Sequence, residues 1–523
     1  MSPPLPSKAL RIPRLWLALH LPYLSIDAFR PHWLADIGTV VMEKNRVVAA
    51  SAVALASGVQ LGMRSGSVHM LLPDAQIRQR DTERENAALH TAAIALLQYS
   101  PQVVLMERAS ILINVGASLR LFGGVRHLCR QVMKTMTTLG LQATLGCTSS
   151  ARGAWLFAYS VHAVHALTTG TAAGSSRSKR SAKYCLSPHK LSHHLDALPV
   201  SLLPAAEPWL EWLHGIGCHH LGSLRQLPRA GLQRRCGKAI LHSLDCAYAE
   251  AAELHQWLEA PPQFNSHTEL PDRIEHADAI IGFARILLLQ LCGWLSHKQL
   301  AITKFQLLLE HERGRHAIAP ALVEISLSEA TWHEEHLSRL LKERLAHLKL
   351  VAPVITIRLH VMQVEAMQAP SASLFPEPGG TREEHHRLLE LLVARLGADN
   401  VLQAAPQTDH RPEVANHWVS VMQARKLLPN SDIAHTMERP AWLLTQALPL
   451  VVRQHRPFYG TPLRLVSPAE RIEAGWWSEQ LVTRDYFVAE NAAHVRYWIY
   501  RERISPANQS DSDDLWFLHG LFG

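Results

Sequence analysis

Two stretches that cannot build a hydrophobic core divide the chain, and they constrain its folding more than any other feature. The first, GTAAGSSRSKRSAK within Thr168–Lys190, consists of small and basic residues. The second, PSASLFPEPGG at Pro370–Gly380, is rich in Pro, Gly and Ser. Such compositions are typical of linkers. Because 523 residues also exceed what one core normally holds, the sequence predicts several domains.

The part of the chain before the first linker mixes strand and helix patterns. Leu15–Leu21 is a short apolar run that predicts a buried strand, and Glu83–Tyr99 has helical periodicity. Val103–Met106 and Ile111–Val115 predict two further strands, and Leu128–Leu139 predicts another helix. This mixture favours an α/β or α+β domain.

The middle of the chain predicts two more domains of different kinds. Residues 196–257 are helical in pattern, whereas residues 266–366 alternate between helices and half-buried strands. The predicted elements of the second region are a helix at Ala277–Leu295, a strand at Ala301–Leu309, a helix at Glu329–Leu348 and a strand at Val354–Val361. A helix at Arg382–Leu396 follows the second linker and precedes a tail rich in Trp, Tyr and Phe.

The composition excludes some classes of protein but does not indicate a single function. Lys and Arg outnumber Asp and Glu by 52 to 45, an excess compatible with a nucleic-acid partner. Seven scattered cysteines without a CxxC pair favour a reducing compartment, so we expect a cytoplasmic protein. We find no apolar stretch long enough to span a bilayer, and neither a P-loop nor a GxSxG motif occurs.

Two clusters of potential metal ligands carry little weight. Cys218 lies among histidines, but the spacing matches no familiar zinc site. His333 and His336 are separated by three residues rather than by the four of a metalloprotease helix, which favours a solvated helix face. The sequence therefore predicts no metal and no cofactor.

The most informative short motif is GIGCHHLGSLRQLP, Gly215–Pro228. An apolar residue between Gly215 and Gly217 is the pattern of a helix-hairpin-helix, in which the backbone turns tightly and presents amides to a DNA phosphate. Arg235–Gly237, followed by another helical segment, fits the second half of such a module. The alternative is an ordinary connection between two helices.

The segment Ser371–Phe375, SASLF, lies in the second linker. Two adjacent large apolar residues in an extended, Pro-flanked segment have no local core to enter, which favours a short linear motif that docks in a hydrophobic pocket. The alternative is that Leu374 and Phe375 pack on a neighbouring domain of the same chain.

Together these features resemble the Y-family DNA polymerases over about residues 14–376. The resemblance rests on a strand ended by Pro, a Gly-rich segment, SLRLFGG at Ser118–Gly124, the helix-hairpin-helix and the final SLF. The tail resembles the polymerase-like member of a bacterial mutagenesis cassette. The matching segments are DHRPE (Asp409–Glu413), RPAWLL (Arg439–Leu444), ERIEAGWW (Glu470–Trp477), RDYFVAEN (Arg484–Asn491) and WFLHGLFG (Trp516–Gly523).

The resemblance implies an α+β multidomain right hand with an extra C-terminal region. Its parts are expected to be a palm at 14–165 with fingers inserted at about 31–80, a basic flexible linker at 166–195, a helix-hairpin-helix thumb at 196–257, a little finger at 266–366, a linker with a clamp-binding motif at 367–380 and a partner-binding region at 381–523.

Active family members hold two Mg²⁺ ions with three palm carboxylates, and this chain lacks all three. The matching positions are Ala18, Ala109 and Ser110. Asp27 is the only acid within Leu15–Phe29, and Glu107 is the only acid within Val103–Val115, so a shifted register leaves at most two. The Tyr and Arg that contact the triphosphate in the family fall on Ala56 and Val59.

We therefore expect a non-catalytic factor in translesion synthesis and induced mutagenesis. The alternatives are an active polymerase with unconventional metal ligands and a simple DNA-binding repair protein. The resemblance implies partners: the β sliding clamp, an error-prone C-family polymerase and a RecA-like accessory protein.

The resemblance also places the expected contacts. Clamp binding falls on Ser373, Leu374 and Phe375, with Ser371 in place of the usual Gln. Sequence-independent DNA binding falls on Gly215 and Gly217 of the thumb and on Lys304 and Arg358 of the little finger. Most tail aromatics are expected in a domain core, and some of them at partner contacts.

Overall fold

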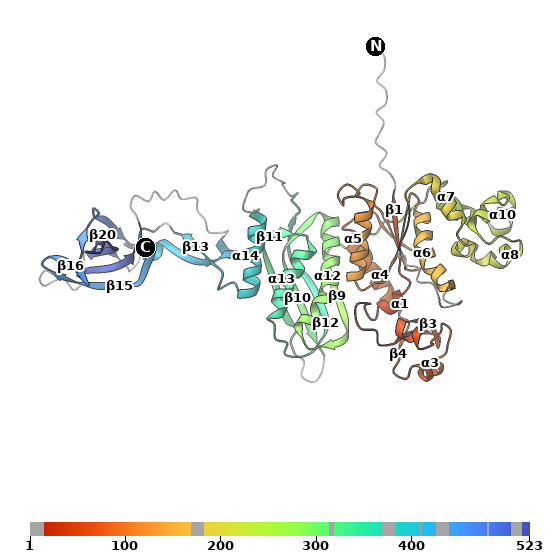
Figure 1. The fold of residues 1–523 in the computed structure, drawn as a ribbon, viewed down its shortest axis with the longest axis horizontal. Coiled ribbons are helices and arrows are strands. Elements are labelled where there is room, and N and C mark those ends of the chain that lie inside the picture. Colours follow the sequence, from red (N-terminus) through yellow and green to blue (C-terminus); the bar gives the residue numbers. More distant parts are fainter. Residues whose placement is uncertain are drawn as a thin grey trace, which may run out of the picture. The chain divides into compact units, whose positions relative to one another are not determined.

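The computed structural model describes residues 15–168, 182–312, 318–368, 382–407, 409–424, 439–477, 481–503 and 515–522 (Figure 1). The chain forms two compact units, Met1–Arg387 and Leu388–Gly523. The first contains the palm, fingers, thumb and little finger, and the second contains the C-terminal region.

The palm is a mixed sheet with strand order β5-β6-β1-β7-β8. Its strands are β1 (Trp16–His20), β5 (Val103–Met106), β6 (Ser110–Asn114), β7 (Thr144–Thr148) and β8 (Ala182–Cys185). Helices α4 (Thr82–Leu96) and α5 (Val125–Thr138) cover one side of β1, and α6 (Ala151–Thr168) covers the other (Figure 1). Because both faces are covered, every residue of β1 is buried, and its sequence is a continuous apolar run.

The palm extends further along the chain than the sequence predicts. Strand β8 lies inside the predicted linker at 166–195 but pairs in parallel with β7, Cys147 opposite Tyr184. The linker prediction is therefore wrong for this strand and for the helix after it. The run Ala182–Cys185 is too short for its periodicity to indicate a strand. It becomes one because its backbone pairs with β7.

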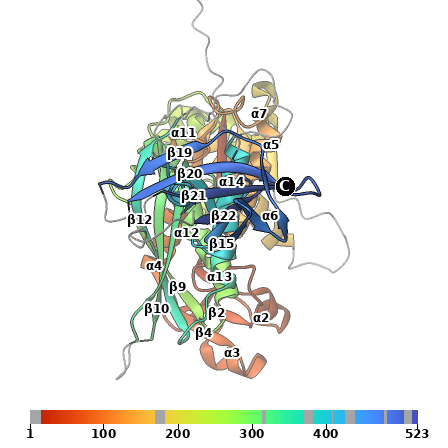
Figure 2. The same ribbon diagram turned by 90° about the vertical axis from the view of Figure 1, so that its left-hand side faces the viewer.

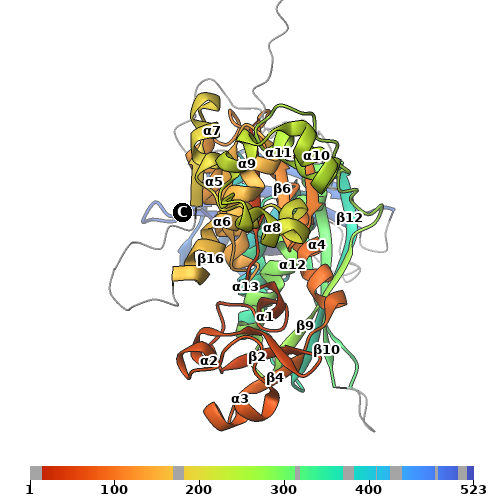
Figure 3. The ribbon, with the colours of Figure 1, turned by 90° about the vertical axis from the view of Figure 1, so that its right-hand side faces the viewer.

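The fingers form a small domain of their own beside the palm (Figure 3). A sheet of order β3-β2-β4 carries a core of small apolar side chains that includes Val40, Met42 and Val68. The elements are α1 (Leu24–Asp27), β2 (Thr39–Glu43), β3 (Arg46–Ala50), α2 (Ala52–Ala56), α3 (Ser65–Leu71) and β4 (Gln76–Gln79).

The thumb is helical (Figure 3). It shares one hydrophobic core with the palm. Its elements are α7 (Pro188–Asp196), η1 (Val200–Leu202), η2 (Pro204–Trp209), α8 (Leu210–Gly215), α9 (Leu221–Gln226), α10 (Arg229–Cys236) and α11 (Lys238–Ala247). Buried Ala18 and Leu112 of the palm belong to the same apolar cluster as Leu213 and Leu244 of the thumb. This continuous core fixes the thumb to the palm.

The little finger is a sheet of order β11-β10-β12-β9 with two helices on one face. Its elements are β9 (Asn265–Ile274), α12 (Ala277–Lys298), β10 (Leu300–His311), β11 (Ala321–Thr331), α13 (Glu334–Ala346) and β12 (Val354–Ala366). The helix predicted from residue 329 begins at Glu334 instead, because residues 329–331 extend β11.

Helix α12 is long and apolar enough to cross a membrane by length and composition, which corrects the expectation that no such stretch exists. It is a core helix, with its own sheet on one side and palm helices on another. A Cβ added to Gly293 would lie 2.0 Å from the carbonyl oxygen of Ile94 in α4. Such close backbone contact needs a glycine.

The C-terminal unit is built mainly of β-strands (Figure 2). Its described strands run in the order β17-β16-β15-β22-β21-β20-β18, with β19 beside β20 and a separate β13–β14 pair. Its elements are β13 (Leu402–Pro406), α15 (Pro412–Ala415), β14 (Asn416–Ser420), α16 (Val421–Ala424), β15 (Trp442–Arg453), β16 (Arg456–Tyr459), β17 (Thr461–Pro462), β18 (Arg464–Leu465), β19 (Glu470–Ala474), β20 (Val482–Glu490), β21 (Arg496–Glu502) and β22 (Trp516–Leu521). Helix α14 (Arg382–Leu396) precedes them and has the bounds that the sequence predicts.

Altered palm centre and candidate nucleic-acid interface

The fold brings the three positions that lack carboxylates close together. Ala18 lies in the central strand β1 opposite Leu112, and His20, two residues on, lies opposite Ser110. Both Ala18 and Ser110 are fully buried. The β5–β6 hairpin turns at Arg108 and Ala109, which have positive φ of 54° and 49°. The amide of Leu21 donates to the carbonyl of Ala109, which fixes the hairpin to the end of β1.

The two acidic side chains closest in sequence have other partners. Glu107 Oε1 pairs with Arg152 at 2.5 Å. Asp27 Oδ2 accepts a hydrogen bond of 2.7 Å from the amide of Gln142 and connects α1 to the loop before β7. Burial raises the pKa of Asp27 to about 6, although the hydrogen bonds from Gln142 oppose that rise. Neither carboxylate is available for a shared metal site.

A guanidinium group lies at the turn where carboxylates are expected. Arg108 donates to the hydroxyl of Tyr159 at 3.0 Å and to Glu207 of the thumb at 2.7 Å. Its guanidinium also lies over the Tyr159 ring, 5.1 Å from the centroid. The guanidinium is thus paired across to the thumb, and a group that only donates hydrogen bonds supplies no ligand for a divalent cation.

His20 fills the space beside this turn. Its Nδ1 lies 2.9 Å from the carbonyl oxygen of Arg108 and 3.3 Å from Ser110 Oγ. The Tyr159 ring packs edge-on at 4.9 Å, and the His162 ring lies 6.0 Å away. Burial lowers the pKa of His20 to about 4, so its imidazole is neutral at pH 7.

This arrangement does not suit the chemistry of nucleotidyl transfer. Two Mg²⁺ ions need several hard anionic oxygens on the protein to neutralise them and to fix their positions. Within the described ranges, no group of three or more His, Cys, Asp or Glu side chains is placed to hold a metal ion. The centre instead contains alanine, serine, a neutral histidine and an arginine.

The fingers lack triphosphate contacts at both expected positions. Val59 is 1% exposed and belongs to the core of the fingers, so its side chain cannot reach a ligand. Ala56 ends α2 at the surface and offers only a methyl group. The change on the nucleotide side therefore accompanies the change at the metal positions.

The thumb glycines form the predicted turn but do not present the predicted amides. Gly217, with φ of 78°, joins α8 to α9, and nothing lies within 4 Å of a Cβ added to it or to Gly215. The amides of Ile216, Gly217 and Cys218, however, donate to carbonyl oxygens of α8. These hydrogen bonds close the C-terminus of that helix. The Gly217 amide is therefore paired within the thumb, and DNA contact through Gly215 and Gly217 stays a prediction.

A second glycine turn in the thumb suits an anion better. Gly237, with φ of 84°, joins α10 to the ten-residue helix α11, and nothing lies within 4 Å of an added Cβ. Exposed Arg234 and Lys238 flank it, and the first amides of α11 have no partner within the helix. The sequence RRCGK contained this signal, but the prediction concentrated on Gly215 and Gly217.

The two basic side chains of the little finger that are predicted to contact DNA, Lys304 and Arg358, both form ion pairs within its sheet. Lys304 Nζ pairs with Glu324 on β11 at 2.6 Å, and Arg358 Nε pairs with Glu310 on β10 at 3.1 Å. A hydrogen bond from Lys304 holds the pKa of Glu324 below its usual value. Lys304 and Arg358 lie on the sheet, but each is matched one-to-one by a carboxylate.

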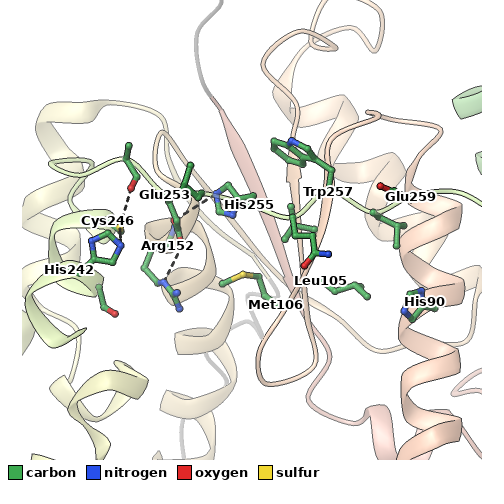
Figure 4. A pocket seen from close by; sticks show the side chains of 16 residues that line it. His90, Leu105, Met106, Arg152, His242, Cys246, Glu253, His255, Trp257 and Glu259 are labelled. Carbon is green, nitrogen blue, oxygen red and sulfur yellow. Dashed lines mark hydrogen bonds and ion pairs between the residues drawn. The ribbon is translucent and has the colours of Figure 1, made fainter. Parts of the chain in front are cut away.

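The segment between the thumb and the little finger is fixed along the palm (Figure 4). Glu253 contacts the Arg152 side chain at 3.4 Å and accepts a hydrogen bond from its amide. The Trp257 ring stacks on the Trp16 ring at 6.1 Å, and the amide of Leu258 donates to Val103 on edge strand β5. A cavity of about 760 Å³ lies between this segment, β5 and α11.

The C-terminal aromatic residues divide into core and surface groups. Tyr486 and Trp498 stack at 4.1 Å and are almost fully buried. By contrast, Trp476 and Trp477, in the turn after β19, are 78% and 57% exposed. The residues predicted to bind the clamp, Ser371, Ser373, Leu374 and Phe375, lie outside the described residues.

Comparison with known proteins places the chain among polymerase-like proteins. Residues 23–158 match the model of the impB/mucB/samB family. Protein ImuB of Caulobacter vibrioides strain NA1000 / CB15N is 22% identical over 488 residues, which cover 89% of this chain and 100% of that protein. Protein ImuB of strain ATCC 19089 matches to the same extent. The chain is thus similar to these two proteins over most of its length. These likenesses support a polymerase-like protein of DNA damage tolerance.

Solved structures of Dbh DNA polymerase also align with the chain. A Dbh ternary complex covers 66% of this chain and 98% of its own, at 14% identity and a TM-score of 0.37. An insertion ternary complex covers 66% and 97%, at 13% identity and a TM-score of 0.36. The order of palm, fingers, thumb and little finger in this chain gives a Y-family polymerase-like right hand with an added C-terminal region.

Proposed function

We propose that this chain is a non-catalytic, polymerase-shaped adaptor of translesion synthesis in the cytoplasm. The observation that supports the proposal is the altered palm centre. There, Ala18 of β1 lies beside the β5–β6 hairpin, whose turn contains Arg108 and Ala109 and is followed by Ser110. Arg108 is itself paired with Glu207, so this turn offers neither carboxylate ligands nor net negative charge to the cations that polymerisation requires.

Primer extension tests the absence of catalysis. Purified chain is incubated with a labelled primer-template and deoxynucleotides, in Mg²⁺ and separately in Mn²⁺. We expect no extended product in either metal at enzyme concentrations up to a tenfold excess over primer. Extension that survives rigorous removal of host polymerases, and that disappears on mutation of Glu107, would establish unconventional metal ligands and overturn the proposal.

The adaptor role requires partners, and the proposed partners are DNA, the β sliding clamp, an error-prone C-family polymerase and a RecA-like accessory protein. The resemblance of the tail segments to the polymerase-like member of a bacterial mutagenesis cassette supports these assignments. Clamp binding is assigned to Ser373, Leu374 and Phe375, with Ser371 weakening the polar half of the contact. Pull-down with purified clamp and partner polymerase distinguishes an adaptor from a simple DNA-binding repair protein, which would retain neither.

DNA contact is assigned mainly to the thumb, at the Gly237 turn. Arg234, Lys238 and the first amides of α11 form a compact donor set for backbone phosphates. The little finger contributes less, because Glu324 and Glu310 neutralise Lys304 and Arg358. We expect Arg234→Gln with Lys238→Gln to weaken oligonucleotide binding by about tenfold at low salt. The variant Lys304→Gln has a smaller effect and serves as the matched comparison.

A further inference from the structure

A second cavity lies where the palm meets the little finger. Helix α12 of the little finger contacts α4 and α5 of the palm in this region (Figure 1). The cavity has a volume of about 490 Å³, and its wall includes residues of the palm, of the little finger and of α14. Sites for small ligands commonly measure about 300–1,000 Å³, so the cavity is large enough for a small organic molecule.

The charged side chains around the cavity are not balanced. Four are basic and two are acidic: Lys134, Arg285, Arg339, Arg387, Glu334 and Glu335. Arg285 Nε pairs with Glu334 at 2.8 Å. Lys134 Nζ pairs with Glu335 at 3.7 Å. Both carboxylates are therefore matched, and two positive charges are left over.

The two remaining cations are Arg339 on α13 and Arg387 on α14, both of them exposed. Neither guanidinium forms an ion pair or a hydrogen bond with another side chain in the part of the chain that the structure describes. Partial burial and the charge of Arg387 lower the pKa of His333, so Arg387 acts at the start of α13. Arg387 also belongs to the same compact unit as the palm and the little finger.

These two side chains suit a phosphate group. A guanidinium presents several N–H donors in one plane and binds phosphate oxygens in pairs. A phosphate monoester carries about 1.5 to 2 negative charges at pH 7, which matches the two positive charges that the cavity has left over.

The wall of the cavity also contains an aromatic ring. Phe122 belongs to the SLRLFGG segment, which takes no part in the altered palm centre, and its side chain is only partly buried. Its ring packs against that of Tyr99 with 5.3 Å between the centroids. The Tyr99 hydroxyl lies 2.8 Å from Thr135 Oγ1, which fixes the ring that supports Phe122. An accessible aromatic ring is a surface on which a nucleic-acid base can stack.

We infer that this cavity binds a nucleoside monophosphate, with its phosphate at Arg339 and Arg387 and its base against Phe122. An acidic protein segment is the competing ligand, but it brings a row of carboxylates where only two cations are unmatched. The site shares no residue with the fingers positions, the thumb turn or the clamp motif. The inference is therefore independent of the proposed function.

The test is isothermal titration calorimetry of the full chain with adenosine monophosphate, and separately with inorganic phosphate and with adenosine. The arginine variant is Arg339→Gln with Arg387→Gln, and Phe122→Leu removes the aromatic ring. The matched control, Arg344→Gln with Arg395→Gln, removes one exposed arginine from each of the same two helices outside the cavity.

We expect adenosine monophosphate to bind more tightly than phosphate or adenosine. The arginine variant should weaken it by about tenfold or more, because charge-assisted hydrogen bonds are lost, and the control should not. Phe122→Leu should weaken adenosine monophosphate by about fivefold or more and leave phosphate binding unchanged.

Several results would overturn the inference. They are an affinity for adenosine monophosphate that the arginine variant leaves unchanged, in protein with an unchanged Tm, and inorganic phosphate that binds as tightly as the nucleotide. Loss of nucleotide binding in Arg108→Gln but not in the arginine variant would place the ligand at the palm centre instead. Poly-glutamate that binds through the two arginines while the nucleotide does not bind would assign them to an acidic protein segment.

A primer-template separates free nucleotide from DNA as the source of the phosphate. If it displaces adenosine monophosphate and binds the arginine variant more weakly than the control, the two arginines contact the DNA backbone and the inference fails. If the chain binds primer-template and clamp but no nucleotide, the inference fails and the proposed function is retained.

Discussion

At the scale of single residues, the palm centre has changed in charge as well as in ligands. Ala18 and Ser110 lie in the packed interior of the sheet, and His20 occupies the space between the hairpin and α6. On the thumb side of the palm centre, Arg108 forms an ion pair with Glu207. A single carboxylate introduced at Ala18 or Ser110 cannot restore a metal site, because His20 and Arg108 now occupy the space around these positions.

Restoration of the carboxylates is the direct test of this adaptation. We expect Ala18→Asp with Ala109→Asp and Ser110→Glu to remain inactive in primer extension with Mg²⁺. The Tm should also fall, because two of the three new carboxylates replace fully buried side chains and lose their hydration. Extended product from this variant would mean that the missing ligands alone explain the loss.

His20 predicts a pH dependence of stability with a definite sign. Its pKa is lowered from 6.5 to about 4 on folding, so between these values the unfolded chain binds a proton that the folded chain does not. Stability therefore falls as the pH drops from 6.5 to 4, by about 2–3 kcal/mol.

Thermal unfolding at several pH values measures this effect. His20→Gln should flatten the decrease in Tm between pH 6.5 and 4. His69→Gln, at an exposed position, should leave the decrease unchanged. Equal pH profiles for the wild-type chain and His20→Gln would remove His20 as the cause.

At the scale of elements, the little finger is held to the palm by helix contact and ion pairs. Gly293 of α12 lies against the backbone of α4, and Trp33 packs edge-on against Phe283 of α12 at 4.9 Å. Arg30–Asp272 and Arg84–Glu269 join the palm and fingers side to β9. Exposed pairs of this kind contribute little, so the helix contact dominates.

Gly293→Val tests this contact. A side chain at position 293 collides with the Ile94 carbonyl, so we expect destabilisation by about 2 kcal/mol or more, measured as a lower Tm. The control is Gly66→Ala in α3, where an added Cβ meets nothing within 4 Å, and a small gain is expected there. A Tm unchanged by Gly293→Val would mean that α12 can separate from α4 without cost.

At the scale of the whole molecule, the proposed contacts lie in different segments of the chain. The thumb turn is near Gly237, and the clamp motif is assigned to Leu374 and Phe375. Because these contacts share no residues, a mutation that removes one of them should leave the binding of the other partner unchanged.

A pair of variants tests this independence. Leu374→Ala with Phe375→Ala should abolish clamp pull-down and leave oligonucleotide affinity within about twofold, because the substitutions remove no charge. Arg234→Gln with Lys238→Gln should have the opposite pattern. Clamp capture that persists in the first variant would remove the clamp assignment.

Sequence patterns determined what depends on local chemistry and order along the chain. The apolar run of β1 and the helices α4, α5 and α12 follow from periodicity and turn residues, whereas the order of palm, thumb and little finger is what the family resemblance implies. The absence of carboxylates at Ala18, Ala109 and Ser110 is likewise readable without a structure. Strand β11 was missed, although Val323, Ile325 and Leu327 alternate, because the residues at its end were read as the start of a helix.

Only the tertiary structure decided which charged groups are neutralised and which are not. Lys304 and Arg358 look like DNA contacts in the sequence, but cross-strand carboxylates pair with them. Arg108 meets Glu207 across 99 residues, and Asp485 meets Arg471 and Arg501 because β20 lies between β19 and β21. Such pairings depend on strand register and on contacts between distant segments. Local propensity carries no information about them, because an ion pair is set by distance in space and not by separation along the chain.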